Sequence, residues 1–262
     1  ALKLVDTIGA RTPVFAGCAS PLVLPAEDAA IVHGDDGFGD TGYTPSPLDA
    51  ESEHAALAIL RLSHAHAGSL VLVAIAPLTN LALALKLDPA LPQRVARLVI
   101  MGGAVTGHGN TRRVPAEFNI GFDPEAAHVV FSAWPRFTLV DWEATMRHGI
   151  AFERMQAWLE ADNSRARFYA AISRKTQAWA RGRGRPKALV ADALAMAVAL
   201  QPGIVVRSEV RHVAIELSGA HARGATVVDW ESRSGGAPNA HIVLDVDHAR
   251  FEALVASALG VA

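Results

Sequence analysis

Short apolar runs recur through the middle and the end of the chain. The run at 70–76 (Leu-Val-Leu-Val-Ala-Ile-Ala) is continuously apolar, which is typical of a strand covered on both faces, and Pro77 ends it. Other apolar or partly alternating segments predict five more strands, at 98–101, 137–140, 210–217, 225–230 and 241–246.

Helical patterns fall between these strands. Helices are expected near 1–10 (the end of an amphipathic helix) and over 79–87, 124–132, 150–159, 188–200 and 247–259. Pro124 suits the first turn of a helix, and Asp123 is placed to cap it. This alternation predicts a single α/β domain with a mainly parallel sheet flanked by helices, in a Rossmann-like arrangement. Such sheets bind ligands beyond the carboxyl ends of the strands, so we expect the site in the loops after 76, 101 and 141.

Composition narrows the class of protein. The 262 residues are 51% hydrophobic and 19% charged, with a formal net charge of −2, which argues against bulk electrostatic capture of nucleic acid or an acidic membrane. The single cysteine, Cys18, cannot form an internal disulfide, and no apolar stretch reaches the length of a membrane helix. No secretion signal opens the chain. We therefore expect a cytoplasmic protein.

Two glycine-rich segments suggest binding functions that the rest of the chain does not support. The segment 103–110 follows a predicted strand, but a dinucleotide-binding fingerprint needs a third glycine where Arg112 stands. The segment 181–187 (Arg-Gly-Arg-Gly-Arg-Pro-Lys) resembles hooks that enter the DNA minor groove. No positive excess elsewhere supports DNA binding, and a mobile charged loop is the favoured interpretation.

Polar side chains of a different kind follow the predicted strand at 98–101. Asn110, Glu117 and Asn119 come after its glycine turn, and in an extended segment Glu117 and Asn119 point the same way. One carboxylate and two amides suit the vicinal hydroxyls of a sugar. A surface loop followed by a helix cap is the alternative interpretation.

These motifs resemble the inosine-uridine preferring nucleoside hydrolases along nearly the whole chain. The matching segments are 33–37 (His-Gly-Asp-Asp-Gly), 78–82 (Leu-Thr-Asn-Leu-Ala), 101–103 (Met-Gly-Gly), 117–120 (Glu-Phe-Asn-Ile), 123–127 (Asp-Pro-Glu-Ala-Ala) and Asp192. The resemblance implies an N-ribohydrolase that converts a purine nucleoside, or a broad range of nucleosides, with water to free base and ribose. It also implies a Ca²⁺ ion that holds the attacking water, and a homo-oligomer, dimer or tetramer.

The resemblance also implies roles for particular residues. Metal ligands would be the Ile75 carbonyl and the Asp192 carboxylate. Ribose hydroxyls would bind Asn110, Glu117 and Asn119, and Asp192 would also border the substrate. Met101 and Phe118 would pack near the sugar. His33 would lie near the leaving base, and Trp179 would stack on that base.

This chain departs from the family pattern in three places. The family's opening Asp-rich motif, which supplies the catalytic base and most metal carboxylates, has no match, so about 50 to 60 residues of that pattern are expected to be missing. Ala191 stands where many members carry a histidine that protonates the leaving base, and Asn110 lies seven residues before Glu117, one more than expected. A non-catalytic relative that binds a ribosylated ligand is therefore the alternative function.

Overall fold

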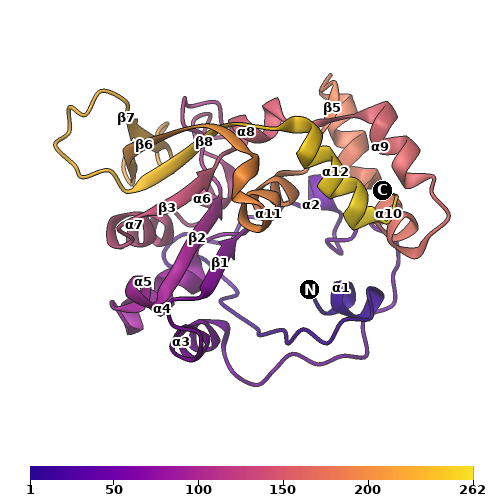
Figure 1. The fold of residues 1–262 in the computed structure, drawn as a ribbon, viewed down its shortest axis with the longest axis horizontal. Helices are drawn as coiled ribbons and strands as arrows, with labels where there is room; N and C mark the ends of the chain where they lie inside the picture. The colour runs from indigo at the N-terminus through magenta and orange to yellow at the C-terminus, as the bar shows by residue number, and fades with distance from the viewer. Residues whose placement is uncertain (262) are drawn as a thin grey trace.

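The computed structural model describes residues 1–261. Its centre is a six-stranded sheet with strand order β1-β2-β3-β8-β6-β7 (Figure 1). The strands are β1 (Leu70–Ala74), β2 (Val95–Met101), β3 (Phe137–Val140), β6 (Val205–Ile215), β7 (Thr226–Asp229) and β8 (Ala240–Val246). β1, β2, β3 and β8 run parallel, whereas β6 and β7 are antiparallel additions. The predicted mainly parallel α/β fold is confirmed.

Several strands differ in their bounds or burial from the sequence-based expectation, and the differences at β1 and β6 are the most informative. β1 is half-buried along its whole length, because it lies at the edge of the sheet and has a single neighbouring strand. β6 starts at Val205, five residues earlier than expected, because pairing with β8 over Val205–Arg211 continues the strand through residues that are exposed or half-buried. The burial of β1 and the start of β6 both depend on strand pairing in the tertiary structure, which a local sequence pattern does not record.

Helices cover both faces of the sheet. One face carries α3 (Ala55–Ala65), α4 (Thr79–Leu87), α5 (Leu91–Arg94) and α7 (Pro124–Ala133). The other carries α8 (Trp142–Arg147), α11 (Ala191–Leu200) and α12 (His248–Leu259), with α9 (Phe152–Leu159) and α10 (Ser164–Gly182) beyond them. A small ribbon of β4 (Ile150–Ala151) and β5 (Lys187–Ala188) joins the latter group.

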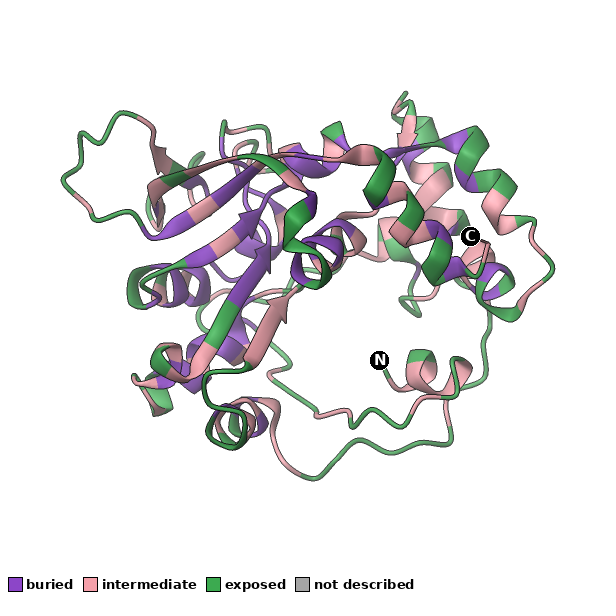
Figure 2. Cartoon of the chain, viewed as in Figure 1, coloured by how far each residue is buried: buried purple, intermediate pink, exposed green. Residues whose placement is uncertain are grey.

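The alternating side chains of β2 divide the interior into two cores. Leu98 and Ile100 pack with α4 and α7, whereas Val99 and Met101 pack with α8 and α11. Figure 2 shows the central part of the sheet and the helix faces that pack on it buried, whereas β1 at the edge is intermediate. The last residue of β2, Met101, therefore ends on the side of the sheet that α11 covers.

The first 54 residues are mostly extended and exposed, apart from α1 (Leu2–Thr7) and α2 (Ala30–His33) (Figures 1 and 2). Among the contacts that anchor this segment, the Asn80 Oδ1 accepts the Cys18 N–H at 2.8 Å, and the Asp123 Oδ2 accepts the Leu22 N–H at 3.0 Å. Farther along, α2 packs on α10.

Helix prediction succeeded where the local signal was strong. Asp123 caps α7 by accepting the Ala126 N–H at 3.0 Å, as its position before Pro124 predicts. The predicted helix at 150–159 begins two residues later, and the one at 188–200 begins at Ala191, because β4 and β5 pair at these sites. α10 and α8 were not predicted. α10 extends to Gly182, so the first two residues of the expected mobile loop 181–187 are helical. Among residues 1–261 no helix is long and apolar enough to span a membrane.

Candidate active site

The carboxyl ends of β2 and β3 are joined by backbone hydrogen bonds. The Gly102 N–H donates to the Val140 carbonyl at 3.2 Å, and the Trp142 N–H donates to the Gly103 carbonyl at 2.9 Å. Gly103 has φ +79°, and a side chain there would meet Thr226, because its Cβ would lie 2.5 Å from the Thr226 Oγ1. A glycine is therefore required at the turn that leaves β2.

Glu117 is the central carboxylate of this region. It is 2% exposed and precedes the short helix α6 (Phe118–Phe122), whose Asn119 and Ile120 N–H groups its side chain accepts at 3.0 and 3.2 Å. Its Oε2 also accepts the Gly103 N–H at 3.0 Å. The carboxylate thus connects the end of β2 to the start of α6.

The expectation of an extended segment at 117–119 is wrong. Glu117 is the N-cap of α6 and Asn119 lies in its first turn, so the two side chains are brought together by a helix start rather than by strand alternation. Asn119 is 9% exposed, and its Nδ2 donates to the Met101 carbonyl at 3.1 Å. The alternative interpretation is correct about the helix cap and wrong about a surface loop, because Glu117 and Asn119 are buried.

Asn110 reaches the same place from the far side of the loop. Its Oδ1 accepts the Phe118 N–H at 2.8 Å, and its own N–H donates to the Ala116 carbonyl at 3.1 Å. The two arms of the loop come close together at Gly109, where a Cβ would lie 2.2 Å from the Ala116 carbonyl oxygen.

Asp192 and Tyr169 complete the group of interacting titratable side chains. Burial raises the pKa of Glu117 to about 7, opposed by its three N–H donors and reinforced by the charge of Asp192. Asp192, in the first turn of α11, is open to solvent on one side, yet the surrounding protein raises its pKa to about 6. Burial raises the pKa of Tyr169 to about 12, with a further contribution from Asp192. Asp192 therefore lies within electrostatic reach of both.

The predicted base-side residues lie on or against α10. His33 ends α2, whose Val32 carbonyl accepts the Thr176 Oγ1 hydrogen at 3.1 Å, and partial burial lowers the pKa of His33. Trp179 is half-buried near the end of α10. Within residues 1–261, no hydrogen bond joins either side chain to Glu117 or Asp192, so their roles stay predictions.

The two predicted metal ligands do not by themselves fit Ca²⁺. Ile75 follows β1 and is 38% exposed. Its backbone carbonyl and the Asp192 carboxylate are the two ligands that the resemblance assigns to this chain. Ca²⁺ takes about six to eight oxygen ligands. Among residues 1–261 no group of three or more His, Cys, Asp or Glu side chains could hold a metal ion.

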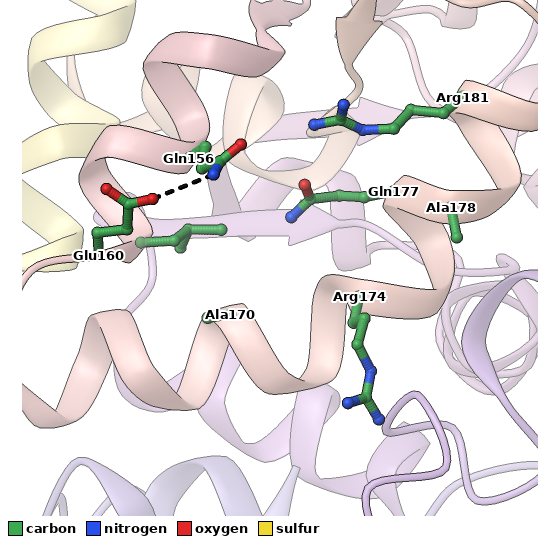
Figure 3. A pocket seen from close by; sticks show the side chains of 8 residues that line it. Gln156, Glu160, Ala170, Arg174, Gln177, Ala178 and Arg181 are labelled. Carbon is green, nitrogen blue, oxygen red and sulfur yellow. Dashed lines mark hydrogen bonds between the residues drawn. The ribbon is translucent and has the colours of Figure 1, made fainter.

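One hollow lies between two outer helices, and a second borders the Asn110 loop. One, of about 400 Å³, lies between α9 and α10; Figure 3 shows Gln177 and Arg181 on one side and the hydrogen-bonded pair Gln156 and Glu160 on the other. It lies away from the strand ends and contains none of the predicted site residues. The second, of about 140 Å³, is lined by Phe118 together with Arg112 and Arg113, and so borders the Asn110 loop.

The structure thus brings one set of predicted residues together and adds others. Met101, Asn110, Glu117, Phe118, Asn119 and Asp192 are linked by the hydrogen bonds and charges described above. Sequence reasoning missed Tyr169, because α10 was not predicted.

A buried carboxylate and amides at the carboxyl ends of parallel strands define a small-molecule site of the α/β class. The sequence profile of the inosine-uridine preferring nucleoside hydrolases matches residues 1–253, and the chain belongs to this family. Its members hydrolyse the N-glycosidic bond of ribonucleosides, so the protein is a ribonucleoside hydrolase and the predicted family is confirmed.

Similar proteins differ in the base that their names mention. The inosine-uridine preferring nucleoside hydrolase of Crithidia fasciculata is 34% identical over 262 residues, covering 98% of this chain and 82% of that protein. A pyrimidine-specific ribonucleoside hydrolase of Escherichia coli O9:H4 (strain HS) is 33% identical, covering 94% and 79%. A solved inosine-guanosine nucleoside hydrolase superposes with a TM-score of 0.90 at 32% identity, covering 98% and 84%.

Proposed function

We propose that this enzyme hydrolyses purine ribonucleosides, or a broad range of ribonucleosides, and binds the ribose at Glu117. The observation that carries the proposal is the buried Glu117 carboxylate, held at the end of β2 by three N–H groups and close to Asp192. A buried carboxylate with a raised pKa beside a second carboxylate is typical of a functional site.

The hydrogen bonds already made leave a defined set of atoms for ribose. Asn119 uses its Nδ2 on the Met101 carbonyl, so its Oδ1 remains to accept a hydroxyl hydrogen. Asn110 uses its Oδ1 on the Phe118 N–H, so its Nδ2 remains to donate. Together with Glu117, these atoms can bind adjacent hydroxyls that each donate and accept.

The nearby carboxylates can also stabilise the reacting sugar. As the bond from C1′ to the base lengthens, positive charge develops on the ribose ring, and a carboxylate beside the ring lowers the energy of that state. The oxygen of water bonds to C1′, and the electron pair of the broken bond leaves with the base. One proton of the water stays on the new C1′ hydroxyl, the other passes to solvent, and the base takes up one proton from solvent. Asp192, whose pKa is raised to about 6, is ionised above that pH.

The Ca²⁺-bound water, the homo-oligomer and a cytoplasmic role in nucleoside salvage come from the family resemblance. Ca²⁺ supplies a polarised water when bound in such a site. Ca²⁺ dependence is tested with a chelator, and the dimer or tetramer is tested by light scattering.

Ala191 favours one other function, a non-catalytic relative that binds a ribosylated ligand. Alanine cannot transfer a proton, so a reaction that needs an acid at this position would stop at binding. The two functions are distinguished by product release.

The test is ribose release from inosine, guanosine, adenosine, uridine and cytidine, with excess Ca²⁺ or with a chelator. We expect release that falls by more than about 100-fold in Asp192→Ala. The matched control is Asp162→Ala, whose side chain is 99% exposed and should have wild-type activity. Saturable ribose binding without release from any nucleoside would overturn the hydrolase proposal and support the non-catalytic alternative.

A further inference from the structure

Two adjacent arginines lie on the loop that carries Asn110 to the candidate ribose site. Arg112 and Arg113 both line the hollow of about 140 Å³ that Phe118 also borders. The arginine ion pairs among residues 1–261 all involve other arginines. Both guanidinium groups therefore have hydrogen-bond donors and a positive charge that no carboxylate of the described chain neutralises.

The main chain and one threonine hold this loop in shape. The Ala116 N–H donates to the Arg113 carbonyl at 2.7 Å, and the Thr111 N–H donates to the Ala116 carbonyl at 3.3 Å. The Thr111 hydroxyl donates to the Arg113 carbonyl at 3.0 Å and accepts the Arg113 N–H at 3.2 Å. The arginine side chains have no part in these bonds, so removing them should leave Asn110 in place.

The lining of the hollow is more positive than the protein as a whole. It contains two guanidinium groups and one carboxylate, that of the exposed Glu27, whereas the whole chain has a formal net charge of −2. Its volume is below the roughly 300 Å³ of a typical ligand pocket, so it suits one group of a ligand rather than a whole nucleoside. A small anion with several acceptor oxygens, such as a phosphate monoester, matches two arginine forks.

The hollow adjoins the ribose site on the side away from the base. Phe118 borders the hollow, and its N–H donates to the Asn110 Oδ1 at 2.8 Å. The residues expected at the leaving base, His33 and Trp179, lie on or against α10, which is a different part of the chain. In a ribonucleoside the base is attached to C1′ and the 5′ carbon to C4′, at opposite ends of the ring. A ribose bound at Glu117 with its base toward α10 would thus direct its 5′ carbon to the arginine loop.

We propose that Arg112 and Arg113 bind a 5′-phosphate, so that the enzyme accepts nucleoside 5′-monophosphates as well as nucleosides. This inference rests on the proposed hydrolase function. The bond that breaks is the same: the oxygen of water bonds to C1′, and the electron pair leaves with the base. One proton of the water stays on the C1′ hydroxyl, the other passes to solvent, and the base takes up one proton from solvent. The phosphate ester stays intact, so the sugar product is ribose 5-phosphate.

The phosphate should act on binding rather than on the chemical step. It is remote from C1′, so its contacts with the arginines are the same in the bound substrate and in the transition state. Such contacts lower KM and leave kcat unchanged. A partly exposed arginine that binds a phosphate should change KM by about tenfold, because solvent screens part of the attraction.

The test compares inosine with inosine 5′-monophosphate, two substrates that share one base, by release of hypoxanthine. The wild type should cleave the nucleotide with a kcat/KM at least about as high as that for inosine, and the sugar product should be ribose 5-phosphate. In the double variant Arg112→Ala/Arg113→Ala, we expect KM for the nucleotide to rise by about 30-fold or more. KM for inosine and both kcat values should change by less than about threefold.

Two further variants test the chemistry of the contact. Arg112→Lys/Arg113→Lys keeps the charge but not the forks and should restore part of the lost affinity for the nucleotide. Glu27→Gln removes the carboxylate that lines the hollow and should lower KM for the nucleotide by about twofold. The matched control is Arg136→Ala, on an exposed arginine directly before β3, at the end of the strand opposite the site.

Three results would overturn the inference. They are a wild type that cleaves inosine but not its 5′-monophosphate, equal changes of KM on both substrates in the double alanine variant, and release of ribose with inorganic phosphate in place of ribose 5-phosphate. Wild-type protein that releases hypoxanthine from neither substrate would instead refute the proposed function itself.

Discussion

Replacing Glu117 with glutamine should change how the free energy of unfolding depends on pH. Glu117 is 2% exposed, and three backbone N–H groups face its two oxygens. Glutamine keeps the size of the side chain but removes the titration. Its amide nitrogen faces at least one of those N–H groups, which costs about 1 to 3 kcal/mol at every pH.

The size of the pH effect follows from the shifted pKa. Burial raises the pKa of Glu117 to about 7 from an ordinary value of 4.5. The folded protein therefore binds this proton more tightly than the unfolded chain, so the stabilisation is complete below the unfolded pKa and is lost as pH rises through the folded one. The shift corresponds to about 3 kcal/mol, lost mostly between about pH 5 and pH 7.

The assay is urea unfolding of the wild type and Glu117→Gln at several pH values between about 5 and 8. The difference in free energy of unfolding, variant minus wild type, should rise by about 2 to 3 kcal/mol across that range. Glu153→Gln, on an exposed glutamate of α9, is the control and should give a constant difference. A constant difference for Glu117→Gln as well would refute the reasoning, because folding would then not raise the pKa of the Glu117 carboxyl group.

Two further substitutions test the frame around the site. Asp123→Ala should lower the free energy of unfolding by about 3 to 5 kcal/mol, because it leaves the Ala126 and Leu22 N–H groups and the Thr79 hydroxyl without their acceptor. Urea unfolding measures the loss, and a change under about 1 kcal/mol would contradict it. Gly103→Ala should lower kcat/KM by more than about tenfold, because the new Cβ displaces the N–H that holds Glu117. Gly182→Ala, with open space around its Cβ, is the control for steady-state kinetics, and equal activity in the two variants would contradict the prediction.

The sequence by itself determined the elements whose signals are local. Continuous apolar runs located β1 and β2, and Asp123 with Pro124 located the start of α7, because a strand core and a helix cap each depend on a few neighbouring residues. The order of the short motifs around Met101, Glu117 and Asp192 indicated the family. Local signals failed for α10, whose many polar residues conceal a long helix that is held by packing against α2, α9 and α12.

Only the tertiary structure decided which distant groups face one another. Glu117 is a helix cap because α6 starts there, and its raised pKa depends on burial and on Asp192, which is far away in sequence. Trp142, Trp179 and Arg185 come from three segments that meet through the packing of α8 and α10, which periodicity does not record. A sequence pattern reports a residue's neighbours within a turn or a strand pair, whereas burial, charge coupling and stacking depend on where the whole chain places them.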